Sequence, residues 1–421
     1  MKKSIVSAVL LCALLVFMAG CGQWADNYAK NHESMLRDPL SGWNIMTAAY
    51  LQPNALDGIS FEWDYYSVHD NAMKFTGSIG YCVVDPRGHL SGEQWYTPFL
   101  MPSGVNVVIA GKFSDGRKFF SFDPHGRAGM VVSATERYLS TPVTDGRFGE
   151  LIPVRGTGGE PDKMVLKGKT QEAEWEITVQ ELWPERNNNR ERTWEVGPDA
   201  GLLLGEHWTV NQFWISTTVN GWIKRLDTNE IMAIDGHGYR ENAFGRWVFP
   251  EGGWDFLYGQ DPANQTDFAF QTYHYQSKKL DFLDVDFIDN GNLVDLRLYA
   301  NKGEFGWYHN DFQYDSVART YIPVDTVIVG KKGDYTIEIQ ADINSDYQPI
   351  LSDTTIVTNI YVINGLFPQI QGTVTRTSTG EVVAIISCQG GGEFSVLRNF
   401  GTEAPEGQLQ KFKDTFRSPL P

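Results

Sequence analysis

Apolar and polar side chains alternate along much of the chain. The alternation is clear from Ile59 to Val68 and from Lys74 to Tyr81, and Asp, Asn, Gly and Pro bound both stretches. Successive side chains of a strand point to opposite faces, so a period of two predicts half-buried antiparallel strands. The pattern recurs at 105–113, 117–123, 129–133 and 173–182, with turn signals between the stretches.

A second series of alternating stretches follows residues 259–265, a run of turn-forming residues where we expect a domain boundary. The stretches lie at 266–276, 279–288, 292–300, 319–329, 335–342, 356–363, 371–376 and 381–387. Asp289-Asn290-Gly291-Asn292 is a strong hairpin signal within the series. Little helix is expected, apart from an amphipathic turn and helix at 405–416.

Each series is about the size of a closed barrel that can hold one small apolar ligand. The pattern therefore predicts an all-β chain with two tandem antiparallel β-barrels. We expect a leader at 1–20, a tether and approach segment at 21–50, an N-terminal domain at 51–258, a C-terminal domain at 259–404 and a tail at 405–421.

The first residues have the composition of a secretory signal. Lys2 and Lys3 precede an apolar run that ends in Met18-Ala19-Gly20-Cys21, and this run is too short to span a bilayer. The small residues before the cysteine resemble the lipobox of bacterial lipoproteins, which predicts lipidation of Cys21. A cleaved soluble protein with an incidental Cys21 is the alternative. Gly22 after the cysteine favours the outer membrane in a Gram-negative host.

Composition and charge exclude several classes of partner. The net charge is −17 at pH 7, from 35 basic and 52 acidic residues, and no basic cluster is interleaved with aromatics. Such a field repels phosphate backbones, so nucleic-acid binding is not expected. The chain has no phosphate loop, dinucleotide fingerprint or zinc-protease helix, and no metal-site spacing of cysteines and histidines. We therefore expect no metal and no organic cofactor, and the sequence identifies no protein partner.

Two of the four cysteines remain once the leader and Cys21 are set aside. Cys82 and Cys388 lie in strand-like apolar stretches far apart in the sequence. An oxidising compartment permits a disulfide between them. Two buried free thiols are equally consistent with the sequence.

The candidate chemistry is concentrated at residues 235–245, where glycines separate His237, Tyr239 and Glu241. Aromatic residues crowd both flanks of this stretch. A carboxyl group among aromatic rings has a raised pKa and can act as an acid on an apolar ligand. The alternative is a glycine-rich tight connection between strands, in which Glu241 pairs with Arg240 or Arg246.

The stretch G-H-G-Y-R-E-N-A-F-G at 236–245 resembles the G-x-G-Y-x-D-H-N-W-G element of the double-lipocalin superfamily. This group includes the carotenoid 1,2-hydratases, kievitone hydratase, AttH-type proteins and fungal pericyclases. Residues 62–66, E-W-D-Y-Y, are similar to the E-W-W-Y-Y element that opens AttH-type domains. The resemblance implies two tandem lipocalin-like barrels and makes Glu241 the proton donor, with Tyr239 as its partner.

The same resemblance implies a ligand pocket lined by further residues. Trp214 matches the tryptophan of a His-x-Trp pair, and Gln212 stands in place of its histidine. Asn242 replaces a second histidine of the group. These departures remove the obvious groups for activating water. The expected substrate contacts are therefore Gln212, Trp214, His237, Asn242 and Trp247.

Two hypotheses of function follow. In the first, Glu241 is the acid of a cofactor-independent lyase or isomerase, of hydratase or cyclase type, that acts on a hydrophobic or aromatic small molecule. Its pocket would lie in the N-terminal barrel or between the two barrels. In the second, an envelope-anchored carrier binds the same kind of compound without changing it. Glycan binding is a weaker third option, because Trp and Tyr suit sugar rings.

Overall fold

A computed structural model describes the chain in a series of separate ranges. These are residues 39–46, 60–84, 103–183, 193–196, 207–246, 254–273, 281–315, 320–342, 347–352, 360–365, 369–397 and 421. Nearly all of them are antiparallel strands in two sheets, with two short 3₁₀ turns, η1 (Asn44–Met46) and η4 (Ala300–Lys302). Within these ranges, no helix has the length and apolar character needed to span a bilayer. The expected leader at 1–20, the lipidation site Cys21 and the helix at 405–416 lie outside them.

The N-terminal sheet has the strand order β4-β3-β2-β1-β12-β11-β9-β8-β7-β6-β5, and β10 pairs with β11. Its strands are β1 (Ser60–Asp70), β2 (Phe75–Val84), β3 (Gly104–Phe113), β4 (Lys118–Pro124), β5 (Val131–Val132), β6 (Leu139–Ser140), β7 (Phe148–Val154), β8 (Lys163–Lys169), β9 (Ala173–Glu181), β10 (Thr193–Val196), β11 (His207–Arg225) and β12 (Ile231–Arg246).

The C-terminal sheet has the order β16-β15-β14-β13-β23-β22-β19-β18-β17, and β21 joins β20 to β23. Its strands are β13 (Trp254–Asp261), β14 (Thr266–Tyr273), β15 (Phe282–Asp289), β16 (Asn292–Tyr299), β17 (Phe305–Asp315), β18 (Thr320–Lys332), β19 (Tyr335–Asp342), β20 (Tyr347–Ser352), β21 (Ile360–Gly365), β22 (Gln369–Arg376) and β23 (Glu381–Leu397).

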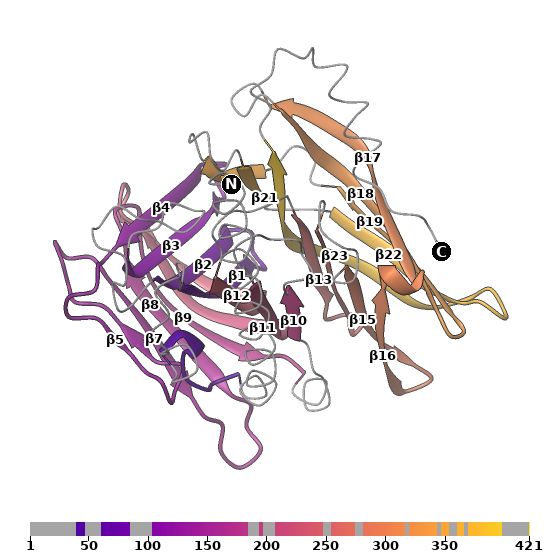
Figure 1. Ribbon diagram of the computed structural model, residues 1–421, viewed down its shortest axis with the longest axis horizontal. Coiled ribbons are helices and arrows are strands. Elements are labelled where there is room, and N and C mark those ends of the chain that lie inside the picture. The colour runs from indigo at the N-terminus through magenta and orange to yellow at the C-terminus, as the bar shows by residue number, and fades with distance from the viewer. Residues whose placement is uncertain are drawn as a thin grey trace, which may run out of the picture.

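Both sheets curl, and they lie side by side with β1, β12 and β13 near their junction (Figure 1). The predicted all-β fold of two tandem lipocalin-like units is therefore confirmed. Among the described residues, the edge strands β4 and β5 do not pair with each other, so the first sheet is a curled half-barrel rather than a closed ring.

Alternation places the core where the sequence predicts it on β9 and β19, whereas β2, which was expected to be half-buried, is buried along its whole length. On β9, every second residue is buried, and Trp175, Ile177 and Val179 belong to the core of the N-terminal sheet. A separate core fills the C-terminal sheet, with Phe270 and Ile328 among its buried members. Within the described residues, each half thus has a large hydrophobic core of its own, as expected of two domains.

Residues 39–46 fill part of the interior of the N-terminal sheet. Leu40, Trp43 and Ile45 are all buried in its core. The indole Nε1 of Trp43 donates a hydrogen bond to the carbonyl oxygen of Tyr138 at 3.1 Å. This approach segment therefore occupies part of the interior of the N-terminal half, which was one of the two expected positions of a ligand pocket.

The expected domain boundary at 258/259 is wrong, because it falls inside β13, which belongs wholly to the C-terminal sheet. The first sheet ends at Arg246 and the second begins at Trp254. The turn-forming run at 259–265 contains the hairpin turn between β13 and β14, and Gln265 has a positive φ of 52° there. The hairpin predicted at 289–292 is confirmed, with φ of 51° at Asn290 and 77° at Gly291.

The glycines at 236–245 do not form a turn. The whole stretch lies within the continuous strand β12. A Cβ atom at Gly236 would lie 1.9 Å from the carbonyl oxygen of His69, and one at Gly238 would lie 2.0 Å from that of Ser67. The glycines therefore permit close contact between β12 and β1, and the interpretation as a tight connection is wrong.

Candidate functional site

The two stretches that carry the sequence resemblance are neighbours in space. Residues 62–66 lie on β1 and pair antiparallel with residues 240–244 of β12, which places Tyr65 opposite Glu241. Opposite residues on paired strands point to the same face of the sheet. Tyr65, Glu241 and Tyr239 therefore share one face, which is the candidate site.

Glu241 is hydrogen-bonded to a tyrosine. The hydroxyl of Tyr239 donates to Glu241 Oε2 at 2.7 Å, and Tyr239 is fully buried whereas Glu241 is partly exposed. Burial raises the pKa of Glu241 from 4.5 to about 8. The carboxyl of Glu393 adds to the rise, the hydrogen bond from Tyr239 opposes it, and Asp64 contributes a smaller increase. A pKa above 7 means that the protonated form of Glu241 is favoured at neutral pH.

Rings from the C-terminal sheet complete the wall beside this acid. The ring of Tyr239 stacks on Tyr258 with centroids 4.6 Å apart and planes at 15°. Phe256 lies 5.1 Å from Tyr239 and 5.5 Å from Tyr258. Since Tyr239 is on β12 and the other two rings are on β13, the candidate site lies where the two sheets meet.

Two histidines extend the site along the strands. His69 Nε2 and the hydroxyl of Tyr258 share a hydrogen bond of 2.9 Å. The imidazole rings of His69 and His237 stack with centroids 5.6 Å apart. Burial lowers the pKa of His69 to about 3, with a further contribution from His237, and burial also lowers the pKa of His237. Both rings are thus neutral at pH 7, and His237 lies on the same face of the sheet as Glu241.

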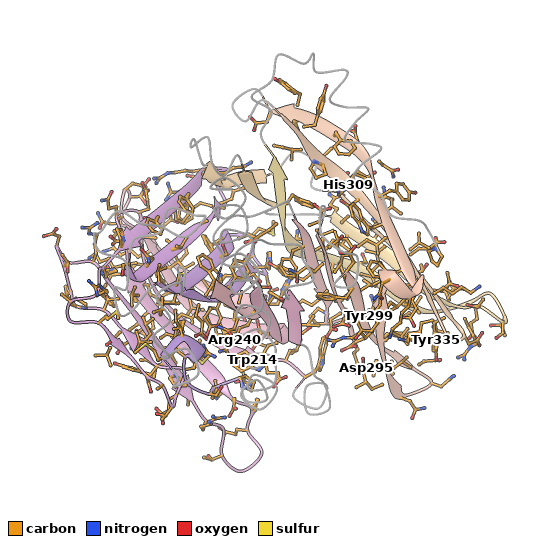
Figure 2. The ribbon with its side chains drawn as sticks, viewed as in Figure 1. Trp214, Arg240, Asp295, Tyr299, His309 and Tyr335 are labelled. Carbon is orange, nitrogen blue, oxygen red and sulfur yellow. The ribbon has the colours of Figure 1, made fainter. Side chains whose placement is uncertain are left out.

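Trp214 and Asn242 lie on the opposite face of the sheet. Trp214 is paired with Arg240, whose guanidinium lies 4.5 Å from its ring centroid (Figure 2). The side-chain amide of Asn242 donates at 3.1 Å to Glu62 Oε1. The resemblance placed both residues in the pocket of Glu241, and the structure separates them from it. The face of Trp214 follows from its pairing with Arg240 between two register shifts, and the local sequence does not show this pairing.

Arg240 does not pair with Glu241. Its Nε donates to Asp64 Oδ1 at 3.1 Å and its Nη2 donates to Asp64 Oδ2 at 3.2 Å, inside the N-terminal sheet. Adjacent residues of a strand point to opposite faces, so Arg240 cannot reach the carboxyl of Glu241. The structural alternative, in which Glu241 forms an ion pair with Arg240, is therefore wrong. The side chain of Arg246 lies outside the described residues.

A buried ionic network lies on that opposite face. Arg137 Nη1 donates to Glu62 Oε1 at 2.5 Å, and its Nε lies 3.6 Å from Asp64 Oδ2. Glu62 Oε2 accepts a hydrogen bond from the amide of Ile45 at 2.8 Å. The acids at 62 and 64 therefore hold the approach segment and the arginines together, which is a structural role. This network was not predicted from the sequence, although acids at core positions of a strand indicate buried partners.

The other predictions from the sequence concern Gln212, Trp247, the two cysteines and metal binding. The backbone of Gln212 lies in β11, but its side chain and the whole of Trp247 are outside the described residues. Cys82 and Cys388 are both free thiols, so the disulfide alternative is wrong. Among the residues described, no group of His, Cys, Asp and Glu is arranged to hold a metal ion.

A hollow of about 570 Å³ lies elsewhere, on the C-terminal sheet. It is lined by residues of β17, β18, β19, β22 and β23, including Val327, Glu338 and Ile385. The residues predicted from the sequence as catalytic residues or substrate contacts are not among those that line this hollow. The hollow is therefore separate from the acid and its tyrosines.

Fold and site together define a class: an all-β protein of two curled antiparallel sheets, with an acid and stacked tyrosines where the sheets meet. The chain is similar in structure to an AttH-type protein of Nitrosomonas europaea, with 11% identity, 86% of this chain and 99% of that chain covered, and a TM-score of 0.44. It is also similar to CghA with Sch210972, with 10% identity, coverages of 87% and 97%, and a TM-score of 0.48.

Kievitone hydratase from Nectria haematococca is a third similar structure, with 11% identity, coverages of 86% and 96%, and a TM-score of 0.44. AttH-type proteins and kievitone hydratase are members of the group that the sequence stretches resemble. At these identities the likeness concerns the fold alone. No protein-family profile and no curated protein matches the sequence.

Proposed function

We propose that the protein is a cofactor-independent lyase or isomerase that acts on a hydrophobic or aromatic small molecule by acid catalysis. Glu241 is the proton donor. The observation that carries the proposal is the burial of this carboxyl, which raises its pKa to about 8. The carboxyl is bonded by a tyrosine hydroxyl rather than by an arginine. A carboxylic acid that keeps its proton at neutral pH can protonate a weakly basic ligand.

The neighbouring groups suit such a reaction. The hydroxyl of Tyr239 fixes the orientation of the carboxyl and leaves Oε1 for the ligand side. Transfer of the proton to an alkene carbon, or to a carbonyl oxygen, leaves positive charge on the ligand and a carboxylate on Glu241. The faces of the rings of Tyr239 and Tyr258 stabilise that positive charge. Tyr65 and Phe256 replace Trp214 and Asn242 as the proposed substrate contacts.

Binding without turnover is the second candidate. The stacked rings of Tyr239, Tyr258 and Phe256 form a rigid aromatic surface that suits an apolar ligand in the absence of any chemistry. A carrier would retain the ligand when Glu241 is replaced by glutamine. An enzyme would retain the ligand but stop converting it.

We also propose that the protein is anchored in the bacterial envelope, with an outer-membrane location, through lipid on Cys21. The proposal rests on the leader composition alone. Metabolic labelling with a radioactive fatty acid should mark the wild-type chain and leave the Cys21→Ala variant unlabelled. Equal labelling of both chains would refute the assignment of Cys21.

The test of the catalytic proposal begins with the purified protein. Compounds are extracted from it and identified by mass spectrometry, and each is then incubated with wild type, Glu241→Gln and Asp235→Asn. Asp235 is an exposed acid on the same strand and serves as the matched control. We expect turnover to fall roughly 100-fold or more in Glu241→Gln and to be unchanged in Asp235→Asn. If wild type binds a compound without altering it, or Glu241→Gln converts it at the wild-type rate, the catalytic proposal fails.

A further inference from the structure

A second carboxyl group from the other domain faces the candidate site. Glu393 lies on β23, where it is the antiparallel partner of Phe256 on β13. Paired residues point to the same face, with Cβ atoms about 5 Å apart. The ring of Phe256 in turn contacts Tyr239, whose hydroxyl donates to Glu241. The partner strand thus places Glu393 on the aromatic face that Glu241 approaches from the N-terminal sheet.

Glycines next to Glu393 allow this arrangement. Gly391 is paired with Tyr258, and a Cβ atom there would lie 2.0 Å from the hydroxyl oxygen of Tyr258. A Cβ atom at Gly392 would lie 2.4 Å from the carbonyl oxygen of Phe256. The ring of Tyr258 can therefore lie across β23 beside Glu393, and both residues are held close to the domain junction.

The electrostatics of the junction agree with this placement. After burial, the carboxyl of Glu393 is the largest contribution that raises the pKa of Glu241. Burial raises the pKa values of Tyr65 and Tyr258, and the charges of Glu393 and Glu241 raise both further. The two tyrosines thus interact with both carboxyl groups, and the two carboxyl groups interact with each other.

The other described titratable groups around Glu241 on this face are tyrosines and neutral histidines. Tyr239 is buried, and its pKa is raised by burial and by Glu241. His69 and His237 have lowered pKa values and are neutral at pH 7. Asp64 is directed to the other face and bound by Arg240. No cation is among the groups that shift the pKa of Glu241.

We propose that Glu393 is the general base of the reaction in which Glu241 is the general acid, and that the reaction is a proton-shifting isomerisation. This inference rests on the function proposed above. Glu241 gives its proton to one carbon of a double bond in the ligand. Glu393 removes a proton from a carbon next to the cationic centre, and the electron pair of that C–H bond forms the new double bond.

The step balances without an oxidant, reductant or water. One proton enters the ligand and one leaves it, so the product is an isomer of the substrate. Glu241 ends as a carboxylate and Glu393 as an acid. Both side chains are partly exposed, so solvent can return the proton from Glu393 to Glu241 before the next turnover.

The test uses the full-length protein, the compound extracted from it, and the variants Glu393→Gln and Glu393→Asp. Glu381→Gln, an exposed glutamate at the start of the same strand, is the matched control. Binding is measured by quenching of tryptophan fluorescence and turnover by chromatography. The protonation of Glu241 is followed by the ¹³C-carboxyl signals of protein labelled with [5-¹³C]glutamate, and the signal is assigned with Glu241→Gln.

We expect Glu393→Gln to bind the compound as wild type does and to lose roughly 100-fold in turnover. Glu393→Asp should recover part of the rate, and Glu381→Gln should match wild type. The titration midpoint of Glu241 should move to lower pH in Glu393→Gln, because a neighbouring negative charge has been removed. In heavy water, the isomeric product should carry deuterium on the protonated carbon.

Wild-type turnover in Glu393→Gln, or an unmoved titration of Glu241, would overturn the role of Glu393. Glu241→Gln would still be inactive in that case, and the proposed acid catalysis would stand. If Glu241→Gln itself turns the compound over at the full rate, the proposed function fails and the role of Glu393 fails with it. A product that has gained the elements of water would overturn the isomerisation alone.

Discussion

Replacing Glu241 by glutamine should change how the stability of the protein depends on pH. The folded-state pKa of Glu241 is about 8, and its ordinary value is 4.5. Between these two pH values the folded chain therefore binds more protons at this position than the unfolded chain does. The contribution of Glu241 to the free energy of unfolding is therefore complete below pH 4.5 and is lost as the pH rises to about 8. Glutamine mimics the neutral acid and does not titrate, so the variant lacks this loss.

The size of the effect follows from the distance between the two pKa values. Each pH unit corresponds to about 1.36 kcal/mol, so a separation of about 3.5 units gives at most about 5 kcal/mol at pH 9. Glu241 is partly exposed, and water near the carboxylate reduces the penalty. We therefore expect the free energy of unfolding of Glu241→Gln to gain about 2 to 4 kcal/mol over wild type between pH 5 and pH 9.

Urea unfolding followed by tryptophan fluorescence at pH 5, 7 and 9 measures this difference. The comparison uses wild type, Glu241→Gln and the exposed control Asp235→Asn, because a two-domain chain requires comparison of matched curves. The midpoint of Glu241→Gln should move above that of wild type as the pH rises, while Asp235→Asn should follow wild type. Parallel pH profiles for wild type and Glu241→Gln would refute the reasoning that Glu241 is protonated at neutral pH.

Three further predictions concern the strands that hold the acid. Tyr239→Phe removes the hydrogen bond that lowers the pKa of Glu241, so the carboxyl titration should move to higher pH and unfolding should cost about 1 kcal/mol less. Gly238→Ala places a Cβ atom 2.0 Å from a carbonyl oxygen of β1, and thermal unfolding should show a loss of at least about 2 kcal/mol. Arg240→Met leaves the buried side chain of Asp64 without its main partner, and urea unfolding should show a loss of about 3 to 5 kcal/mol at pH 7.

The strands and the fold class were predictable because alternation is a local property of the sequence. Stretches such as 75–84 and 335–342 bury one face or both, and turn residues end them. The hairpin at 289–292 was predictable for the same reason, since Asn290 and Gly291 adopt the positive φ that such a turn requires. The positions of many strands and turns along the chain could therefore be predicted from the sequence alone.

Two local signals were misleading because they have more than one physical cause. Glycine permits a turn, but it also permits two strands to approach closely, and Gly236 and Gly238 serve the second purpose. The turn-forming run at 259–265 resembled a linker between domains, but it contains a hairpin turn within one sheet. Only pairing partners distinguish these cases, and the partners are distant in the sequence.

The site was predictable in part. The resemblance predicts Tyr239 as the partner of Glu241, and the two side chains share a face because the strand is regular between them. The resemblance placed Trp214 in the same pocket, but its face depends on its pairing with β12, where the register is irregular on both sides. Contacts from the other sheet, such as those of Tyr258 and Glu393, depend on how the two sheets meet and leave no pattern in the sequence around 241.

The titration of Glu241 itself tests the central claim most directly. Protein labelled with [5-¹³C]glutamate is titrated from pH 4 to pH 10, and the carboxyl signal absent from Glu241→Gln is followed. The account predicts a midpoint of about 8 for that signal, far above the midpoints of exposed glutamates. A midpoint near 4.5 would show a carboxylate at neutral pH and would contradict the account.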